Sequence, residues 1–144
     1  LSPTISAIFL LDCISFAISI LFEFSFNNLF ISLFYELEEI PVGLFDDSPN
    51  VTDFNRTFAH CEKLTSIPPG LFDNHRKVLD FDCVFNLCKS IESESPYTLI
   101  EGEKVHLYER EKYPDYFVTP QVFSDSFGSC TKLIDYSSIP SEWK

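Results

Sequence analysis

A stretch of eight residues occurs twice in this chain, 27 residues apart, and this repetition constrains the fold more than any other feature. Residues 40–47 read IPVGLFDD and residues 67–74 read IPPGLFDN. Apolar positions between the two copies follow the same period, since Val51, Phe54 and Phe58 recur as Val78, Phe81 and Phe85. A fixed period of this size is typical of proteins in which successive units stack on one another. The repetition therefore predicts a solenoid.

The period divides into half-units of about 13–14 residues, which begin at Phe45, Phe58, Phe72 and Phe85. Each half-unit reads Phe-x-x-(Cys or small/polar)-x-x-aliphatic-x-x-(Phe or Ile). A spacing of three is typical of one face of a short helical turn that runs into a strand. A half-unit is too short to bury its own apolar face, so stability is expected from contacts between neighbouring units. The half-unit pattern therefore predicts an α/β solenoid in which the four phenylalanines are buried in neighbouring coils.

Residues 57–68 read TFAHCEKLTSIP. This run resembles the (Ala/Thr)-Phe-x-x-Cys-x-x-Leu-Thr-Ser-Ile-Pro signature of BspA-like leucine-rich repeats, a family of bacterial surface and secreted proteins. The resemblance covers about residues 25–144, with an interruption between residues 92 and 120. It implies a curved leucine-rich-repeat solenoid of the α/β type that lies outside the cell and acts in adhesion or ligand binding. It implies no catalytic residues.

The first 36 residues form a hydrophobic segment that differs from the predicted repeat domain at residues 37–144. Asp12 is the only charged residue between positions 5 and 22. Eighteen such residues are long enough to span a bilayer, but a central carboxylate is costly there and no cation precedes the segment to orient it. Three interpretations stay open: a transmembrane or export segment, a segment packed on the first coil, and a non-native translation of a T-rich gene.

The repeat domain is interrupted by an insertion at residues 94–120. Residues 97–100 and 104–108 flank Glu101-Gly102-Glu103, and this arrangement predicts a β-hairpin, followed by a charged loop at residues 109–120. The insertion gathers candidate binding residues, which are Tyr97, His106, Tyr108, Tyr113 and Tyr116. They either cover the end of the stacked units or form a contact surface, because tyrosine-rich loops on a rigid scaffold are common binding sites. In the second case Tyr108, Tyr113 and Tyr116 are the expected exposed anchors.

Composition excludes some partners. The chain has 22 acidic and 10 basic residues and a net charge of −12, which argues against nucleic acids and anionic membrane surfaces. Cys61, Cys88 and Cys130 share one repeat position and are expected to be buried thiols. Neither a metal site, nor a cofactor, nor a catalytic group is predicted.

The sequence thus predicts a non-enzymatic scaffold outside the cell or on its surface, which binds a protein or a glycan in adhesion. The alternative is a membrane-anchored structural protein whose residues 5–22 span the bilayer.

Overall fold

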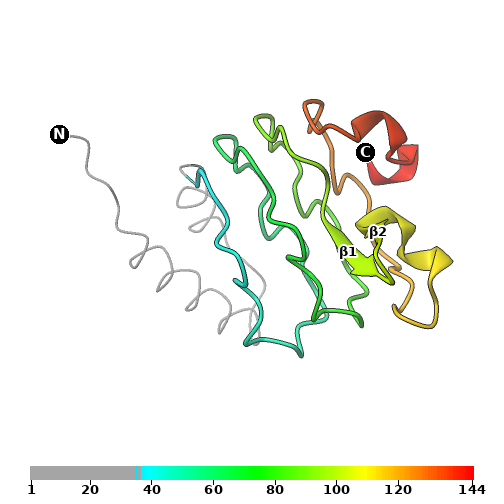
Figure 1. Ribbon diagram of the computed structural model, residues 1–144. Coiled ribbons are helices and arrows are strands. Elements are labelled where there is room, and N and C mark those ends of the chain that lie inside the picture. Colours follow the sequence, from blue (N-terminus) through cyan, green and yellow to red (C-terminus); the bar gives the residue numbers. More distant parts are fainter. Residues whose placement is uncertain (1–34, 36) are drawn as a thin grey trace. The chain divides into compact units, whose positions relative to one another are not determined.

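The computed structural model describes residue 35 and residues 37–144, all of which lie in the unit Ile31–Lys144. The candidate membrane segment at residues 5–22 lies outside the described residues. Within the described part of the chain, no helix is long and apolar enough to cross a bilayer. The regular elements, in chain order, are the strands β1 (Tyr97–Ile100) and β2 (Glu103–His106) and the 3₁₀ helices η1 (Leu107–Lys112), η2 (Tyr136–Ser138) and η3 (Ser141–Trp143) (Figure 1).

Three turn segments, residues 54–61, 81–88 and 123–130, are each built from consecutive β-turns. In every one of them, alternate amides donate to the carbonyl three residues earlier, with N···O distances of 3.0–3.3 Å. Two residues of each segment have a positive φ, namely Arg56 and His60, Cys83 and Leu87, and Asp125 and Ser129. A left-handed residue interrupts a right-handed helix, and it suits the third position of a type II turn. The chain therefore forms successive turns here in place of a helix.

The turn segments lie side by side and run in parallel (Figure 1). The amides at 54, 56, 58 and 60 donate to the carbonyls at 80, 82, 84 and 86, and the amides at 81, 83, 85 and 87 donate to those at 122, 124, 126 and 128. All eight N···O distances are 2.8–2.9 Å. One set of alternate amides thus closes the local turns while the other joins neighbouring segments. This division satisfies the buried backbone without a regular strand or an α-helix.

Phenylalanine rings fill the space inside the turn segments. Phe58 and Phe85 stack with centroids 5.2 Å apart and planes 7° apart, and Phe85 stacks in the same way on Phe127 at 5.9 Å. Phe45 stacks on Phe72 at 6.1 Å. The predicted burial of Phe45, Phe58, Phe72 and Phe85 is confirmed, since each has an exposed fraction of 2% or less.

The cysteines of the turn segments are buried free thiols, as predicted for Cys61, Cys88 and Cys130. The Sγ of Cys88 donates to the carbonyl of Phe58, and the Sγ of Cys130 donates to that of Phe85, both at 3.0 Å. Burial raises the pKa of the Cys130 thiol, so this group keeps the proton that it donates. The thiol therefore packs as a small apolar group and also pairs a carbonyl of the neighbouring segment.

The predicted α/β leucine-rich-repeat-like solenoid is wrong. The described residues contain no α-helix, and their only regular sheet is the two-stranded hairpin of β1 and β2. The spacing of three, which favours a helical turn when only the sequence is considered, is met by turns whose amide bonds also span three residues. In each segment two non-glycine residues have a positive φ, and the spacing of the apolar residues does not mark these positions as left-handed.

The inserted hairpin is present, although β2 covers residues 103–106 and not the predicted 104–108, and η1 occupies residues 107–112, where the end of the strand and the start of a loop were predicted. Tyr97 pairs with His106 and Ile100 pairs with Glu103 in an antiparallel register. The two connecting residues, Glu101 and Gly102, have φ values of 53° and 90°, and two positive φ values match the twist of the strands. The residues on either side of the hairpin are also joined, because the amide of Leu107 donates to the carbonyl of Pro96 at 2.9 Å.

The C-terminal residues cover the last turn segment. The amide of Phe127 donates to the carbonyl of Trp143 at 2.9 Å. The indole of Trp143 stacks on Phe123 with centroids 4.4 Å apart. Trp143 is itself buried, so η3 closes the apolar interior on this side.

Candidate functional site

The strand pleat gives the hairpin two different faces. Tyr97, Leu99, Lys104 and His106 point to one side, because cross-strand partners share a face and side chains alternate along a strand. We call these four residues the hairpin face. Leu99 is 60% exposed, which is high for a leucine in a strand. The opposite side, with Ile100 and Val105, packs on the body of the protein and is buried.

A short ion pair lies at the edge of the hairpin face. The Nζ of Lys104 is 2.6 Å from an Oε atom of Glu94 and 4.7 Å from the centroid of the Tyr97 ring. Its hydrogen bond with Glu94 raises the pKa of Lys104. The ammonium group therefore stays charged and covers one side of the tyrosine ring.

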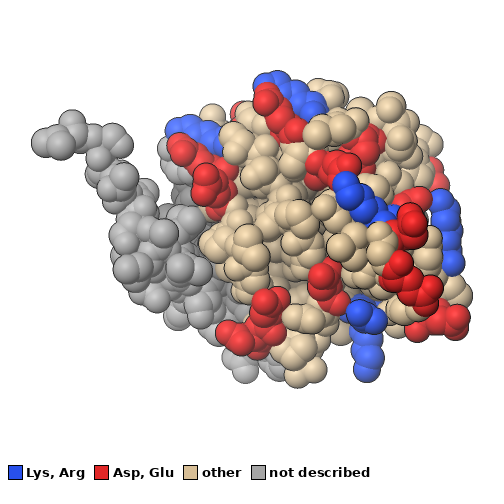
Figure 2. All heavy atoms as spheres, viewed as in Figure 1, with Lys and Arg blue, Asp and Glu red and all other residues tan. Residues whose placement is uncertain are grey.

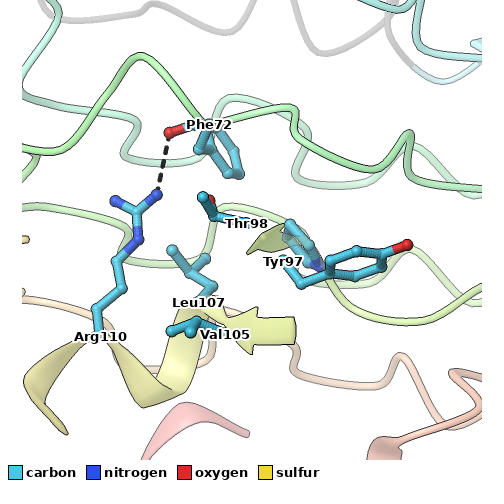
Figure 3. A pocket seen from close by; sticks show the side chains of 7 residues that line it. Phe72, Tyr97, Thr98, Val105, Leu107 and Arg110 are labelled. Atoms are coloured by element: carbon cyan, nitrogen blue, oxygen red, sulfur yellow. Dashed lines mark hydrogen bonds between the residues drawn. The ribbon is translucent and has the colours of Figure 1, made fainter. Parts of the chain in front are cut away.

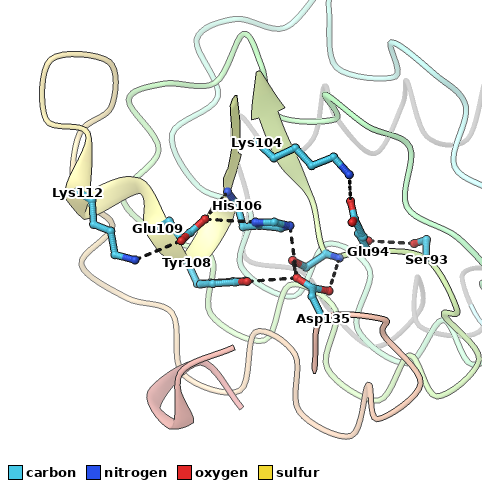
Figure 4. A network of polar contacts seen from close by, with 9 residues as sticks. Ser93, Glu94, Lys104, His106, Tyr108, Glu109, Lys112 and Asp135 are labelled. Carbon is cyan, nitrogen blue, oxygen red and sulfur yellow. Dashed lines mark hydrogen bonds and ion pairs between the residues drawn. The ribbon is translucent and has the colours of Figure 1, made fainter. Parts of the chain in front are cut away.

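His106 lies between two carboxylates (Figure 4). Its Nδ1 is 3.2 Å from Oε2 of Glu109, and its Nε2 is 3.6 Å from Oδ2 of Asp135. The imidazole also stacks on Tyr108, with centroids 5.3 Å apart and planes 13° apart, and meets Tyr97 at 61°. These contacts hold the ring in one orientation.

Asp135 joins the C-terminal part of the chain to the hairpin. Its carboxylate accepts hydrogen bonds from the amide of Ser95 at 2.9 Å, from the Ser95 hydroxyl and from the Tyr108 hydroxyl at 3.3 Å. Burial and the negative charge of Asp135 raise the pKa of Tyr108, so the phenol stays neutral and remains a donor. The network fixes both the entry to β1 and Tyr108, which lies in η1 just after β2.

Ser95, His106 and Asp135 are the residue types of a hydrolytic triad, but their order in space is different. In a triad the imidazole lies between the hydroxyl and the carboxylate and takes the hydroxyl proton. Here Asp135 lies between the other two, and the hydroxyl of Ser95 donates directly to it. Ser95 is also 1% exposed. The arrangement positions the hairpin and does not activate a nucleophile.

The structure divides the five predicted binding residues into two groups. His106 contacts both Tyr97, which shares the hairpin face with it, and Tyr108. Tyr113 and Tyr116 instead pack against the opposite side of the hairpin, on the cluster of Ile100, Val105 and Phe117.

Tyr108, Tyr113 and Tyr116, the expected exposed anchors, are half-buried. The hydroxyl of Tyr116 donates to Glu101 at 2.9 Å. Leu99 is exposed but is not among the binding residues predicted from the sequence, although strand alternation places it on the same face as Tyr97. Asp135 was also missed, and it carries no local signal because its partner Ser95 is 40 residues away.

A buried cation holds η1 against the body of the protein. The guanidinium of Arg110 donates to the carbonyl of His75 at 2.9 Å and to that of Phe72 at 3.1 Å, and Figure 3 shows the second of these bonds. It also lies 4.5 Å from the ring centroid of Phe117. Burial lowers the pKa of Arg110 to about 10. The gap beside it, lined by Thr98 and other hairpin residues, has no room for a water molecule, and the hydrogen bonds of this arginine hold η1 in place.

Across residue 35 and residues 37–144, no group of three His, Cys, Asp or Glu side chains could hold a metal ion. Comparisons of the chain with protein-family models, with curated proteins and with solved structures found no match.

Proposed function

We propose that this protein acts by binding a protein or glycan partner outside the cell, in the manner of an adhesion protein, and that the hairpin face is its contact surface. The observation that carries this proposal is the 60% exposure of Leu99 on a face whose other side chains are held by fixed contacts. A large apolar side chain gains free energy when a partner removes it from water.

The surroundings of Leu99 support a binding role because they are already ordered. The network of Asp135, Ser95 and Tyr108 fixes the hairpin on both sides, and the ion pair of Lys104 with Glu94 fixes its edge. A surface that is ordered before binding loses less conformational entropy when the partner arrives. The extracellular location and the kinship with BspA-like proteins are part of this proposal and have their support in residues 57–68.

A paired screen tests the proposal. The full chain is applied to a glycan array and to a random peptide library displayed on phage, alongside Leu99→Asp and the matched control Val42→Asp. Val42 is 85% exposed in another segment, so both substitutions place a carboxylate on the surface. We expect at least one ligand that Leu99→Asp binds about tenfold more weakly or worse and that Val42→Asp binds normally. If every ligand binds all three proteins alike, the hairpin face is not the contact surface.

A further inference from the structure

We infer that His106 is a proton-dependent link that ties the hairpin to the C-terminal part of the chain. When its imidazole takes up a proton from solvent, each ring nitrogen donates to a carboxylate, Nδ1 to Glu109 and Nε2 to Asp135. The hairpin is then held more tightly in mildly acidic solution than at neutral pH. This inference goes beyond the proposed function, because it concerns how firmly the hairpin is attached and not what its face contacts.

Both nitrogens of the imidazole face a carboxylate oxygen. Nδ1 is 3.2 Å from Oε2 of Glu109, and Nε2 is 3.6 Å from Oδ2 of Asp135 (Figure 4). Nε2 is buried and has no hydrogen-bond partner in the described part of the chain. A neutral imidazole carries one proton, so in either tautomer one nitrogen turns its lone pair toward a carboxylate oxygen. Only the protonated ring gives both carboxylates a donor.

Both carboxylates are held in place by other donors, so the proton adds contacts to a site that is already formed. One oxygen of Glu109 accepts from the amide of His106 and the other from Lys112, both at 3.2 Å. Asp135 accepts from the amide of Ser95 at 2.9 Å and from the Ser95 hydroxyl. Burial raises the pKa of Glu109, but its hydrogen bonds outweigh burial and lower this pKa overall. Glu109 therefore stays ionised in the range where histidine titrates.

The aromatic neighbours of the ring also favour its charged form. The phenol ring of Tyr108 stacks on the imidazole with centroids 5.3 Å apart, a separation at which an aromatic face attracts a cation. Tyr97 meets the imidazole from β1 with centroids 5.8 Å apart. Burial opposes the charge, since the His106 side chain is 16% exposed. The ring is not fully withdrawn from water, however, and two negative groups contact it directly.

The nearby lysines do not cancel this attraction. Lys104, on the same strand, lies 2.6 Å from Glu94, and Lys112 binds the oxygen of Glu109 that does not face His106. Acidic residues outnumber basic ones by 22 to 10 in the whole chain, and Figure 2 shows acidic side chains spread more widely than basic ones over the visible side of the molecule. The overall charge therefore adds to the attraction of a proton.

The sign of the expected pH effect follows from these contacts. Because the attached hairpin favours the protonated ring, the attachment is strongest at acidic pH and weakens as the pH rises through the range in which histidine loses its proton. His75 has the opposite effect, since a proton on that ring is disfavoured among Phe45 and Phe54 in the core. The two effects separate because one is local to the hairpin and the other belongs to the turn segments.

Hydrogen exchange followed by mass spectrometry tests the link on the full chain. After correction for the intrinsic effect of pH on exchange, protection of residues 95–108 should rise about threefold between about pH 7.5 and about pH 5.5. Residues 81–88 should show no such gain. His106→Gln should abolish the rise, because glutamine takes up no proton. If His106→Gln and the parent give the same pH profile, the inference is wrong.

His60→Asn is the matched control for this experiment. The chain has three histidines, and His60 lies in the turn segment 54–61 at a positive φ that asparagine tolerates. The substitution removes a titrating ring outside the hairpin, so the rise in residues 95–108 should persist. A rise that disappears in His60→Asn as well as in His106→Gln would show that the response is not specific to the link. Circular dichroism establishes that each variant is folded before exchange is compared.

A second measurement reads the proton itself. The ¹⁵N chemical shifts of the two ring nitrogens of His106, observed through the carbon-bound ring protons, give the ratio of protonated to neutral imidazole. At about pH 6.5 this ratio should be about threefold lower in Asp135→Asn than in the parent, because one of the two carboxylates has lost its charge. Equal ratios in the two proteins would mean that Asp135 does not hold the proton, which would overturn the inference.

Discussion

The turn segments and the hairpin are held by different kinds of contact. In the turn segments a buried ring meets the ring at the equivalent position of the next segment, as Phe58 meets Phe85. Around the hairpin, directed polar contacts join distant parts of the chain, as Asp135 joins Ser95. Ring stacking is spread over many atoms and tolerates small shifts, whereas a carboxylate network depends on each donor. The first region should therefore set global stability, and the second should set local order at the candidate binding surface.

The largest effect is expected in the stacked rings. Replacement of Phe85 by alanine removes a fully buried ring that stacks on both Phe58 and Phe127. The substitution should lower the free energy of unfolding by about 3–5 kcal/mol, measured by urea denaturation. Val42→Ala, at an exposed position, should change it by less than about 0.5 kcal/mol. A loss below about 1 kcal/mol for Phe85→Ala would contradict the view that the stack sets global stability.

Arg110 connects the two regions and should have the next largest effect. Arg110→Met keeps much of the side-chain volume but leaves the carbonyls of Phe72 and His75 without their donors. We expect a loss of about 2 kcal/mol in the free energy of unfolding, because relief of the buried charge offsets part of the lost bonds. Lys112→Met on the same 3₁₀ helix is the control, since its surface ion pair contributes little. If the two variants are equally stable, the buried guanidinium does not anchor η1.

Asp135→Asn should loosen the hairpin and leave the turn segments intact. The amide keeps one acceptor for Ser95 but loses the charge near His106 and the second carboxylate oxygen. Hydrogen exchange followed by mass spectrometry should become about fivefold faster in residues 95–108, which corresponds to about 1 kcal/mol of local stability. Exchange in residues 81–88 should not change. Asp125→Asn, in an exposed turn where asparagine also tolerates positive φ, is the control, and a uniform change in both regions would contradict the separation.

The smallest effect is expected from the titration of His75. Burial lowers the pKa of this histidine below 6.5, and the nearby Arg110 lowers it further, while the hydrogen bond with the Ser48 carbonyl and the charge of Asp46 raise it. The unfolded chain therefore binds the proton more readily, so the protein should lose stability as the pH falls below about 6.5. His75→Gln should show a shallower loss than the parent between pH 6.5 and pH 5. Parallel pH profiles of the two proteins would rule out this contribution.

Side-chain spacing predicted which residues are buried better than it predicted how the backbone runs. The phenylalanines and cysteines at equivalent positions are buried, since apolar burial depends on composition and period. The helical turn assigned to the same spacing is wrong, because a helix and a run of β-turns can both place an apolar side chain at every third residue. The hairpin was predictable because Gly102 and the alternation around it are local signals. Its exposed side was predicted only in part, since Tyr97 and His106 were identified and Leu99 was not.

The sequence by itself determined which rings are buried, through the period of its apolar residues. It also determined where the chain forms the hairpin, because the turn at Glu101-Gly102 is a local signal. Tertiary structure alone decided which side of the hairpin is open. Tyr113 and Tyr116 cover one side, and Asp135, from the C-terminal part of the chain, fixes the other in place. These contacts span long distances in sequence, so no local pattern encodes them, and they form only when the distant segments pack together.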